Sequence, residues 1–279
     1  MAEVTSKVDK VAKLADPMES SIDASTQEML RRAQRLNVET VFDRAVTMKP
    51  CAIGMQGICC KNCAMGPCRL PLPKDGIQGE DTRKGLCGAT ANTICARNFI
   101  RMIAGGAAAH SDHGRNVAIT FLAAARGETH DYKIKDPIKL MQIAPYFGVA
   151  TTVEVDGVVK DRDIKEIAIA VGEKAVAEWG KTSGTVDYLK RAPQPLQDKW
   201  AEAGVLPRNV DREIVEIMHR THMGVDQDFR NLMKQGTRAA LADGTGGPAA
   251  AQHLSVPPSL VGALDTQEVV TADKQRIGA

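Results

Sequence analysis

Hydrophobic residues recur every three or four positions along most of this 279-residue chain, which is the spacing of helices that bury one face. Glycine, proline and aspartate interrupt the pattern at several points and divide it into separate helices. The pattern predicts helices over residues 25–36, 38–48, 91–103, 137–146, 164–176, 195–203, 211–222 and 228–242. It is missing before residue 25 and again in the segment 51–87.

Local signals predict where several of these helices begin and end. Ser25 and Glu28 have the spacing of a capping box, and Asp136 followed by Pro137 has the order of an N-cap and a first helical residue. Pro50 ends the second helix because proline lacks an amide proton and clashes with the preceding turn. The Gly105-Gly106 pair predicts either a kink or the close approach of a neighbouring element.

These patterns divide the chain into three parts. Residues 1–24 are polar and predict a flexible arm, whereas residues 25–244 predict one helical domain. Residues 245–279 are rich in Gly, Pro and Ala and predict a poorly ordered tail. The fold class expected is therefore mostly α, a helical domain with an irregular Cys-rich loop near its N-terminus.

Composition agrees with this fold class and excludes some partners. Aromatic residues make up only 4% of the chain while hydrophobic residues make up 43%, which favours helices packed through aliphatic side chains. The net charge is +2 with acids and bases interleaved, so no basic surface indicates nucleic acid. No apolar run is long enough for a signal peptide or a membrane span. We expect a cytoplasmic protein.

Six of the seven cysteines fall within residues 51–87, where hydrophobic periodicity disappears. Disulfides are disfavoured because the chain is long and carries no secretory segment. Zinc modules favour two C-x2-C pairs, and the second pair is missing here. Three of the cysteines form C-x2-C-x4-C, with Gly66 and Pro67 making a tight turn, and a fourth follows later, an arrangement that favours an iron–sulfur cluster. We call these four residues the cysteine quartet: Cys60, Cys63, Cys68 and Cys87.

Two clustered cysteines, Cys51 and Cys59, remain outside the quartet, and we call them the outer pair. Two thiolates cannot complete a cluster, but a twofold dimer that brings both pairs to its axis would supply four. This hypothesis predicts about six irons per chain, four in the quartet and half of a shared cluster. Cys95 falls on the apolar face of a predicted helix and is expected to be a buried core thiol.

The sequence resembles the N-terminal helical domain of the anaerobic nickel–iron carbon monoxide dehydrogenases. The resemblance covers residues 25–244 and is carried by the runs 59–69, 85–90, 96–98, 107–115, 131–137, 207–209 and 219–226. It implies that the quartet holds an intrasubunit [4Fe-4S] cluster that relays electrons. It also implies that Cys51 and Cys59 hold half of a [4Fe-4S] cluster shared across a homodimer.

The family oxidises CO with water to CO2, two protons and two electrons at a nickel–iron–sulfur centre, and a ferredoxin-type protein accepts the electrons. Protons leave along histidines on a helix, and His110 and His113 match the first two of them. The next two positions carry Asn116 and Ile119, so the match is incomplete. His219 and His222 have the same spacing without a neighbouring cysteine, which favours a structural role.

The resemblance stops before the domains that supply the nickel–iron–sulfur ligands, and no cysteine follows Cys95. The first hypothesis is therefore the N-terminal part of a carbon monoxide dehydrogenase, as a truncation, a frameshift or one half of a split enzyme with a separate C-terminal catalytic chain. The alternative is a stand-alone iron–sulfur electron carrier or assembly partner without catalysis. A hybrid-cluster hydroxylamine reductase fits less well because of the adjacent cysteines 59 and 60.

Overall fold

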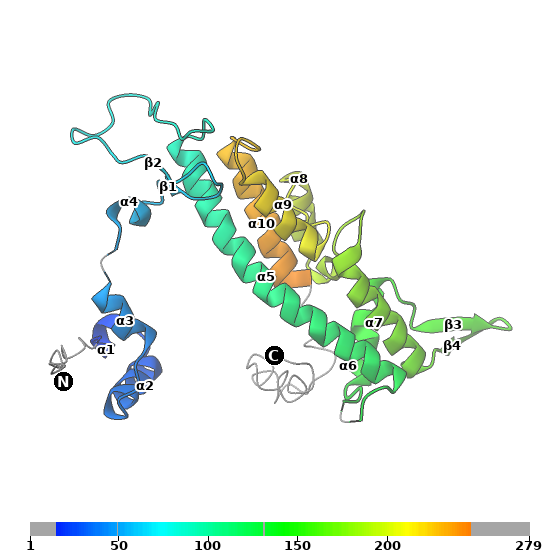
Figure 1. Ribbon diagram of the computed structural model, residues 1–279. Coiled ribbons are helices and arrows are strands. Elements are labelled where there is room, and N and C mark those ends of the chain that lie inside the picture. Colours follow the sequence, from blue (N-terminus) through cyan, green and yellow to red (C-terminus); the bar gives the residue numbers. More distant parts are fainter. Residues whose placement is uncertain (1–14, 49, 131, 247–279) are drawn as a thin grey trace, which may run out of the picture. The chain divides into compact units, whose positions relative to one another are not determined.

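The computed structural model describes residues 15–48, 50–130 and 132–246 of the chain (Figure 1). The chain divides into two compact units, Met1–Gln56 and Gly57–Ala279. The expectation of a mostly α fold is confirmed. The predicted tail at 245–279 lies almost entirely outside the described residues, and so does most of the predicted arm.

The first unit contains short helices, which are α1 (Pro17–Ser20), α2 (Ala24–Arg35), α3 (Val41–Thr47) and α4 (Ala52–Met55). The predicted capping box at Ser25 is wrong, because Asp23 caps α2 by accepting a hydrogen bond from the Thr26 amide at 2.6 Å. A capping box does occur at α3, where Thr40 and Asp43 bond each other's backbone amides.

The second unit is built on α5 (Ala91–Arg126), a continuous helix of 36 residues. It also contains α6 (Pro137–Ile143), η1 (Ala144–Phe147), α7 (Ile164–Gly180), η2 (Asp187–Arg191), α8 (Gln194–Glu202), α9 (Val210–Arg220) and α10 (Phe229–Gly246). Two antiparallel ladders complete it, β1 (Cys59–Cys60) with β2 (Cys68–Arg69), and β3 (Thr152–Val155) with β4 (Val158–Asp161). The irregular segment predicted at 51–87 contains the short helix α4, and from residue 57 to residue 87 it is irregular apart from β1 and β2.

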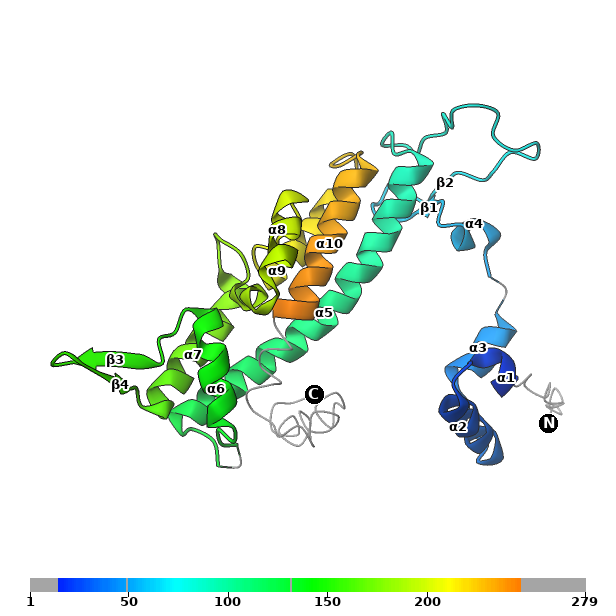
Figure 2. The same ribbon diagram turned by 180° about the vertical axis from the view of Figure 1, so that it is seen from behind.

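Each half of α5 has its own hydrophobic core. The first half packs against α9 and α10 around Ile100, Ile217 and Leu232, all of which are fully buried. The second half packs against α6 and α7 around Phe121 and Ile167. Both views show α10 beside the first half of α5, and α6 and α7 at its far end (Figures 1 and 2). The single helix α5 therefore fixes the relative positions of the two hydrophobic cores.

Of the two alternatives predicted for Gly105-Gly106, a kink or a close approach, the close approach is wrong, because a Cβ at either residue would meet nothing within 4 Å of the described residues. The close approaches are made by glycines on the facing helices. A Cβ at Gly172 of α7 would lie 3.1 Å from Leu122, and one at Gly236 of α10 would lie 2.7 Å from Ile100. Glycine is needed at these contacts because the helix backbones pass so near α5.

The hairpin of β3 and β4 is not among the elements predicted from the sequence, although its turn has a strong local signal. Asp156 and Gly157 have φ values of +56° and +75°, as the two central residues of a type I′ turn require. All eight strand residues are exposed, and the hydrophobic alternation is short: Val153 and Val155 alternate with polar residues in β3, but Val158 and Val159 are adjacent in β4. The hairpin extends away from the helices in both views (Figure 2).

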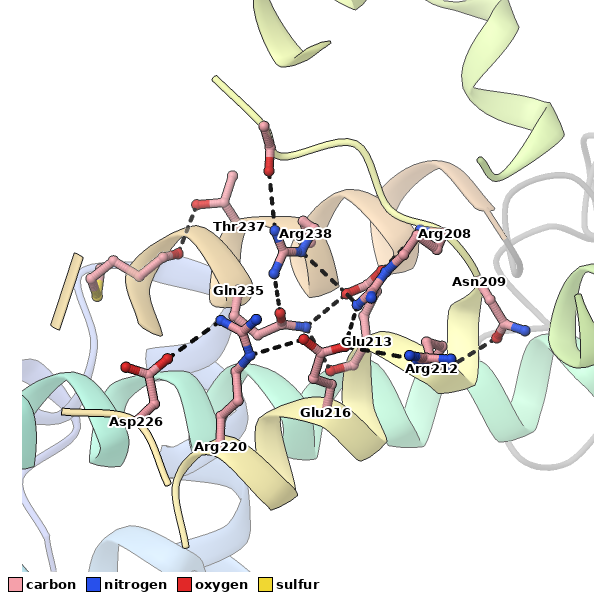
Figure 3. A network of polar contacts seen from close by, with 12 residues as sticks. Arg208, Asn209, Arg212, Glu213, Glu216, Arg220, Asp226, Gln235, Thr237 and Arg238 are labelled. Atoms are coloured by element: carbon pink, nitrogen blue, oxygen red, sulfur yellow. Dashed lines mark hydrogen bonds and ion pairs between the residues drawn. The ribbon is translucent and has the colours of Figure 1, made fainter. Parts of the chain in front are cut away.

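A network of buried charges joins α9 and α10 to the segment before α9 (Figure 3). The side chain of Glu213 is fully buried and accepts hydrogen bonds from the Arg208 backbone amide at 2.8 Å and from Gln235 at 2.7 Å. Its carboxylate also lies 3.0 Å from the Arg208 guanidinium and 3.4 Å from Nε of Arg238. Glu216 pairs with Arg208 and with Arg220. Glu213 is thus the centre of a fully compensated buried cluster.

The packing of α10 on α5 predicts the effect of two alanine substitutions. Gly236→Ala should lower the free energy of unfolding by about 1–3 kcal/mol, because its Cβ would overlap the side chain of Ile100. Gly105→Ala is the matched control on α5, where space is open and alanine favours the helix by about 0.5–1 kcal/mol. Urea unfolding of both variants measures the difference. Equal effects would contradict the close approach.

The buried network predicts that Glu213→Gln lowers the free energy of unfolding by about 3 kcal/mol. This value lies at the low end of the range for breaking a buried ion pair, because the side chain of Arg208 is 37% exposed and its charge is partly screened by solvent. The control is Glu173→Gln, whose exposed pair with Arg126 contributes less than about 0.5 kcal/mol. Urea unfolding at pH 7 measures both.

The same network predicts a pH dependence. Burial raises the pKa of Glu213, but hydrogen bonds from Arg208 and its charge lower it more, so the net pKa lies below the usual 4.5. A lowered pKa in the folded state means that the stabilisation is present above pH 4.5 and is lost as the pH falls through the folded-state pKa. The difference between wild type and Glu213→Gln should therefore shrink in acid. A constant difference would contradict the ionised network.

Candidate metal centre

The segment before α5 folds back on itself and brings the cysteine quartet together. The β1–β2 ladder pairs Cys60 directly with Cys68, although eight positions separate them in the chain. Between them the chain turns at a cis bond between Gly66 and Pro67, with the Gly66 amide donating to the carbonyl of Cys63 at 3.3 Å. A Cβ at Gly66 would lie 2.9 Å from the carbonyl oxygen of Cys60, so only glycine fits this turn.

All four thiols of the quartet line one pocket. The other residues that line it are Asn62, Met65, Gly85, Leu86, Ala89, Ile94, Arg97, Thr221 and Met223. Gly85 allows the second half of the segment to approach, because a Cβ there would lie 3.2 Å from the Cβ of Cys68. The pocket is formed where the loop before α5, the first turns of α5 and the loop after α9 meet.

Across residues 15–48, 50–130 and 132–246, no group of three or more His, Cys, Asp or Glu side chains is placed to hold a single metal ion. A tetrahedral zinc site needs its sulfurs about 2.3 Å from one centre. A cluster of four irons is wider and takes one thiolate at each corner. The quartet has the donor type and the number of donors that such a cluster takes.

Hydrogen-bond donors point at two of the thiols. The backbone amide of Leu86 lies 3.4 Å from Sγ of Cys68, and Nη1 of Arg97 lies 3.4 Å from Sγ of Cys87. Burial raises the pKa of the Cys87 thiol, but Arg97 and backbone amides lower it more, so the net pKa is about 7 instead of 9.0. In addition, Nδ2 of Asn62 is buried without a partner among the described residues. The lining thus offers positive charge and donors to an anionic group.

The loop after α9 fixes Cys87 from the other side. Gln227 donates to the carbonyl of Cys87 at 2.7 Å, and its Nε2 lies 3.9 Å from Sγ of the same residue. The carbonyl of Gln227 in turn accepts a hydrogen bond from Thr93 of α5 at 2.7 Å. Helix and loop together therefore set the direction of this thiol.

The outer pair is divided between the two units, with Cys51 in the first and Cys59 in the second. Cys51 is exposed and occupies the N-cap position of α4. Cys59 neighbours Cys60 in β1, so their side chains point to opposite faces of the ladder and Cys59 does not line the pocket. Asn98 of α5 holds this strand by donating to the carbonyls of Gly57 and Cys59, at 2.8 and 3.0 Å.

The expectation that Cys95 is a buried core thiol is wrong. Its side chain is only partly buried, and Sγ lies 3.5 Å from the carbonyl oxygen of Gly57. At Cys95, α5 therefore faces the cysteine-rich segment and not the hydrophobic core.

His110 and His113 lie in the middle of α5. His110 is exposed and its Nδ1 lies 2.9 Å from the carboxylate of Asp243 in α10. Nε2 of His113 is buried and has no hydrogen-bond partner in the part of the chain that the structure describes. His219 and His222 are exposed at the end of α9, and their structural role stays a prediction. The proton path also stays a prediction.

None of the residues predicted for the site is Arg97, Gln227 or Asn62, although Arg97 and Asn62 line the pocket and Gln227 contacts Cys87. A signal for Arg97 was present, because it falls three residues from both Ile94 and Ile100, on the buried face of the helix pattern. Gln227 and Asn62 stand in irregular segments without such a signal. Their contacts depend on how distant parts of the chain meet.

Comparison with family models matches residues 58–257 to the Prismane/CO dehydrogenase family. The match extends beyond residue 244, the position at which the sequence resemblance was expected to end. Carbon monoxide dehydrogenase 1 of Methanosarcina acetivorans is 43% identical over 238 residues, which are 85% of this chain and 36% of that protein. The chain therefore spans about a third of the length of this relative.

Solved structures show the same similarity. An as-isolated, Ni-free carbon monoxide dehydrogenase from Thermococcus sp. AM4 aligns with a TM-score of 0.73 and 40% identity, covering 88% of this chain and 37% of that one. A second structure, described as having NiZn[Fe4S4] and NiNi[Fe4S4] clusters in the α subunits of acetyl-CoA synthase/carbon monoxide dehydrogenase, aligns with a TM-score of 0.72. Its identity is 33%, over 88% of this chain and 36% of that one.

Proposed function

Because this chain belongs to the Prismane/CO dehydrogenase family, we propose that it provides the electron-relay part of a carbon monoxide dehydrogenase. The observation that carries the proposal is the lining of one pocket by all four thiols of the quartet. A [4Fe-4S] cluster bound there would supply one-electron transfer without proton chemistry. The whole enzyme would oxidise CO with water to CO2, two protons and two electrons.

The residues of the chain have separate tasks in this proposal. The quartet holds the cluster, while Gly66 and Gly85 let the backbone close around it. Met65, Leu86 and Ile94 place apolar atoms in its lining, and Ile94 among them is fully buried. The Leu86 amide donates to Cys68 and stabilises negative charge on its sulfur.

The outer pair is proposed to hold half of a second [4Fe-4S] cluster, shared with an identical subunit. Cys59 supports this assignment because it points away from the face of β1 that bears Cys60, so it is available to a different group. A homodimer is then required, since two thiolates per chain cannot complete a cluster. Electrons would pass from the quartet through the shared site to a ferredoxin-type acceptor.

The nickel–iron–sulfur centre of the proposed enzyme needs soft ligands beyond these residues. The chain has seven cysteines, six are assigned to the two clusters, and the seventh, Cys95, lies against Gly57. The proposed enzyme therefore obtains those ligands from residues that this 279-residue sequence does not contain.

A stand-alone electron carrier or assembly partner is the second candidate. In that case the quartet would complete its cluster without ligands from another protein, because all four of its thiols belong to one chain. Both candidates share the quartet cluster and differ in the source of its electrons.

Iron content tests the proposed clusters. Anaerobically purified protein should contain about six irons per chain and be a dimer, and Cys63→Ser should lower this number to about two. Cys59→Ser should leave about four irons, because it removes only the shared site. Cys95→Ser is the matched control and should change neither value. A protein with zinc in place of iron would sink the assignment, and four irons in a monomer would sink the shared site alone.

CO-dependent reduction of a viologen dye separates the two candidates. The 279 residues alone should show no activity, because the proposed centre lacks its ligands. If a C-terminal chain bearing the family's further domains restores activity, the electron-relay proposal is supported. CO oxidation by the 279 residues alone would refute the proposal that the catalytic ligands come from other residues. A chain that contains its clusters but is activated by no such C-terminal chain would favour the stand-alone electron carrier.

A further inference from the structure

Arg97 is a buried cation without a buried anion beside it. It is 1% exposed and one of the largest fully buried side chains among the described residues. Nη2 donates to the carbonyl of Asp226 at 2.7 Å and Nη1 lies 3.4 Å from Sγ of Cys87, whereas Nε has no hydrogen-bond partner among the described residues. Within the described ranges no carboxylate forms an ion pair with it. Among the described residues, the side-chain group with which its guanidinium forms a hydrogen bond is the Cys87 thiol of the quartet.

This environment is unfavourable for an arginine unless an anion occupies the pocket. A guanidinium stays protonated in proteins, and an uncompensated buried charge costs several kcal/mol. Glu213 shows how the same fold treats a buried charge elsewhere, since two arginines and a glutamine surround its carboxylate. Arg97 has no such partner, and the pocket that it lines contains four potential thiolates.

We propose that Arg97 is a positioning residue that fixes Cys87 and raises the reduction potential of the quartet cluster, an inference that rests on the proposed function. Reduction adds one electron to the cluster from a low-potential carrier, with no bond broken and no proton moved. The added negative charge is stabilised by the fixed guanidinium in a buried site, where screening is weak. Arg97 therefore favours the reduced state of the relay.

The contacts around Arg97 explain how its position is fixed. The Asp226 carbonyl holds Nη2 from the loop after α9, so Nη1 is directed toward Sγ of Cys87. Gln227 of the same loop donates to the Cys87 carbonyl. A movement of this loop would shift both the cation and the thiol, which couples the potential to the packing of α9 on α5.

The test is a redox titration of the anaerobic protein, followed by electron paramagnetic resonance. The quartet signal is the one that Cys63→Ser removes. Arg97→Gln should make this cluster about tenfold harder to reduce, which is a potential lower by ~59 mV for one electron. Arg97→Lys keeps the charge and should restore most of the difference.

Arg101→Gln is the matched control, because Arg101 lies one turn further along α5 and donates to Thr221 at 2.8 Å, without contact to the quartet. Its titration should follow wild type. A loaded Arg97→Gln protein with an unchanged potential would overturn the inference and leave the proposed function intact. A wild-type protein that binds no iron–sulfur cluster would overturn both.

A measurement on the wild-type protein covers the case in which Arg97→Gln fails to fold or to load. Labelling arginine with nitrogen-15 in the guanidinium group should give a nitrogen coupling to the reduced quartet cluster in pulsed resonance. Arg97→Lys should lose this coupling, and Arg101→Gln should keep it. Absence of the coupling in the loaded wild type would overturn the contact on which the inference depends.

Discussion

The packing of α5 along its whole length is the constraint on which the second unit depends. Its first half packs with α9 and α10 and its second half with α6 and α7, so one rigid helix relates two hydrophobic cores. The pocket of the quartet lies at the N-terminal end of this helix. Because α9 is packed on α5, the loop that follows α9 reaches Cys87 and Arg97. The candidate metal centre is therefore positioned by the same contacts that stabilise the fold.

The buried charged side chains of Glu213 and Arg97 have different surroundings. Glu213 is enclosed by protein donors and needs nothing else, which is the expected state of a buried charge. Arg97 is equally buried but faces a pocket lined by thiols. The first is a structural ion-pair network, and the second lines the candidate site. No helix among the described residues is long and apolar enough to cross a bilayer.

Much of the fold follows from local sequence. Asp163 caps α7, and Gly148 ends η1 in the left-handed conformation, both as their residue types predict. The errors also have local causes. Asp23 competes with Ser25 as a cap and is a stronger acceptor. The exposed hairpin at Asp156 has strands of only four residues, too short for the alternation in β3 to give a clear pattern. Whether Gly105 or Gly236 marks a close approach depends on the facing helix, which no local pattern specifies.

The sequence by itself determined the donor atoms of the candidate centre, because the quartet spans only 28 positions from Cys60 to Cys87 and its spacing limits what it can bind. Only the tertiary structure decided what surrounds those donors. Arg97 and Cys87 meet Asp226 and Gln227 across 129 and 140 positions of sequence. Such contacts follow from the packing of α9 and α10 on α5. Ligand identity is thus local information, while the charge and the hydrogen bonds around the ligands are a property of the assembled fold.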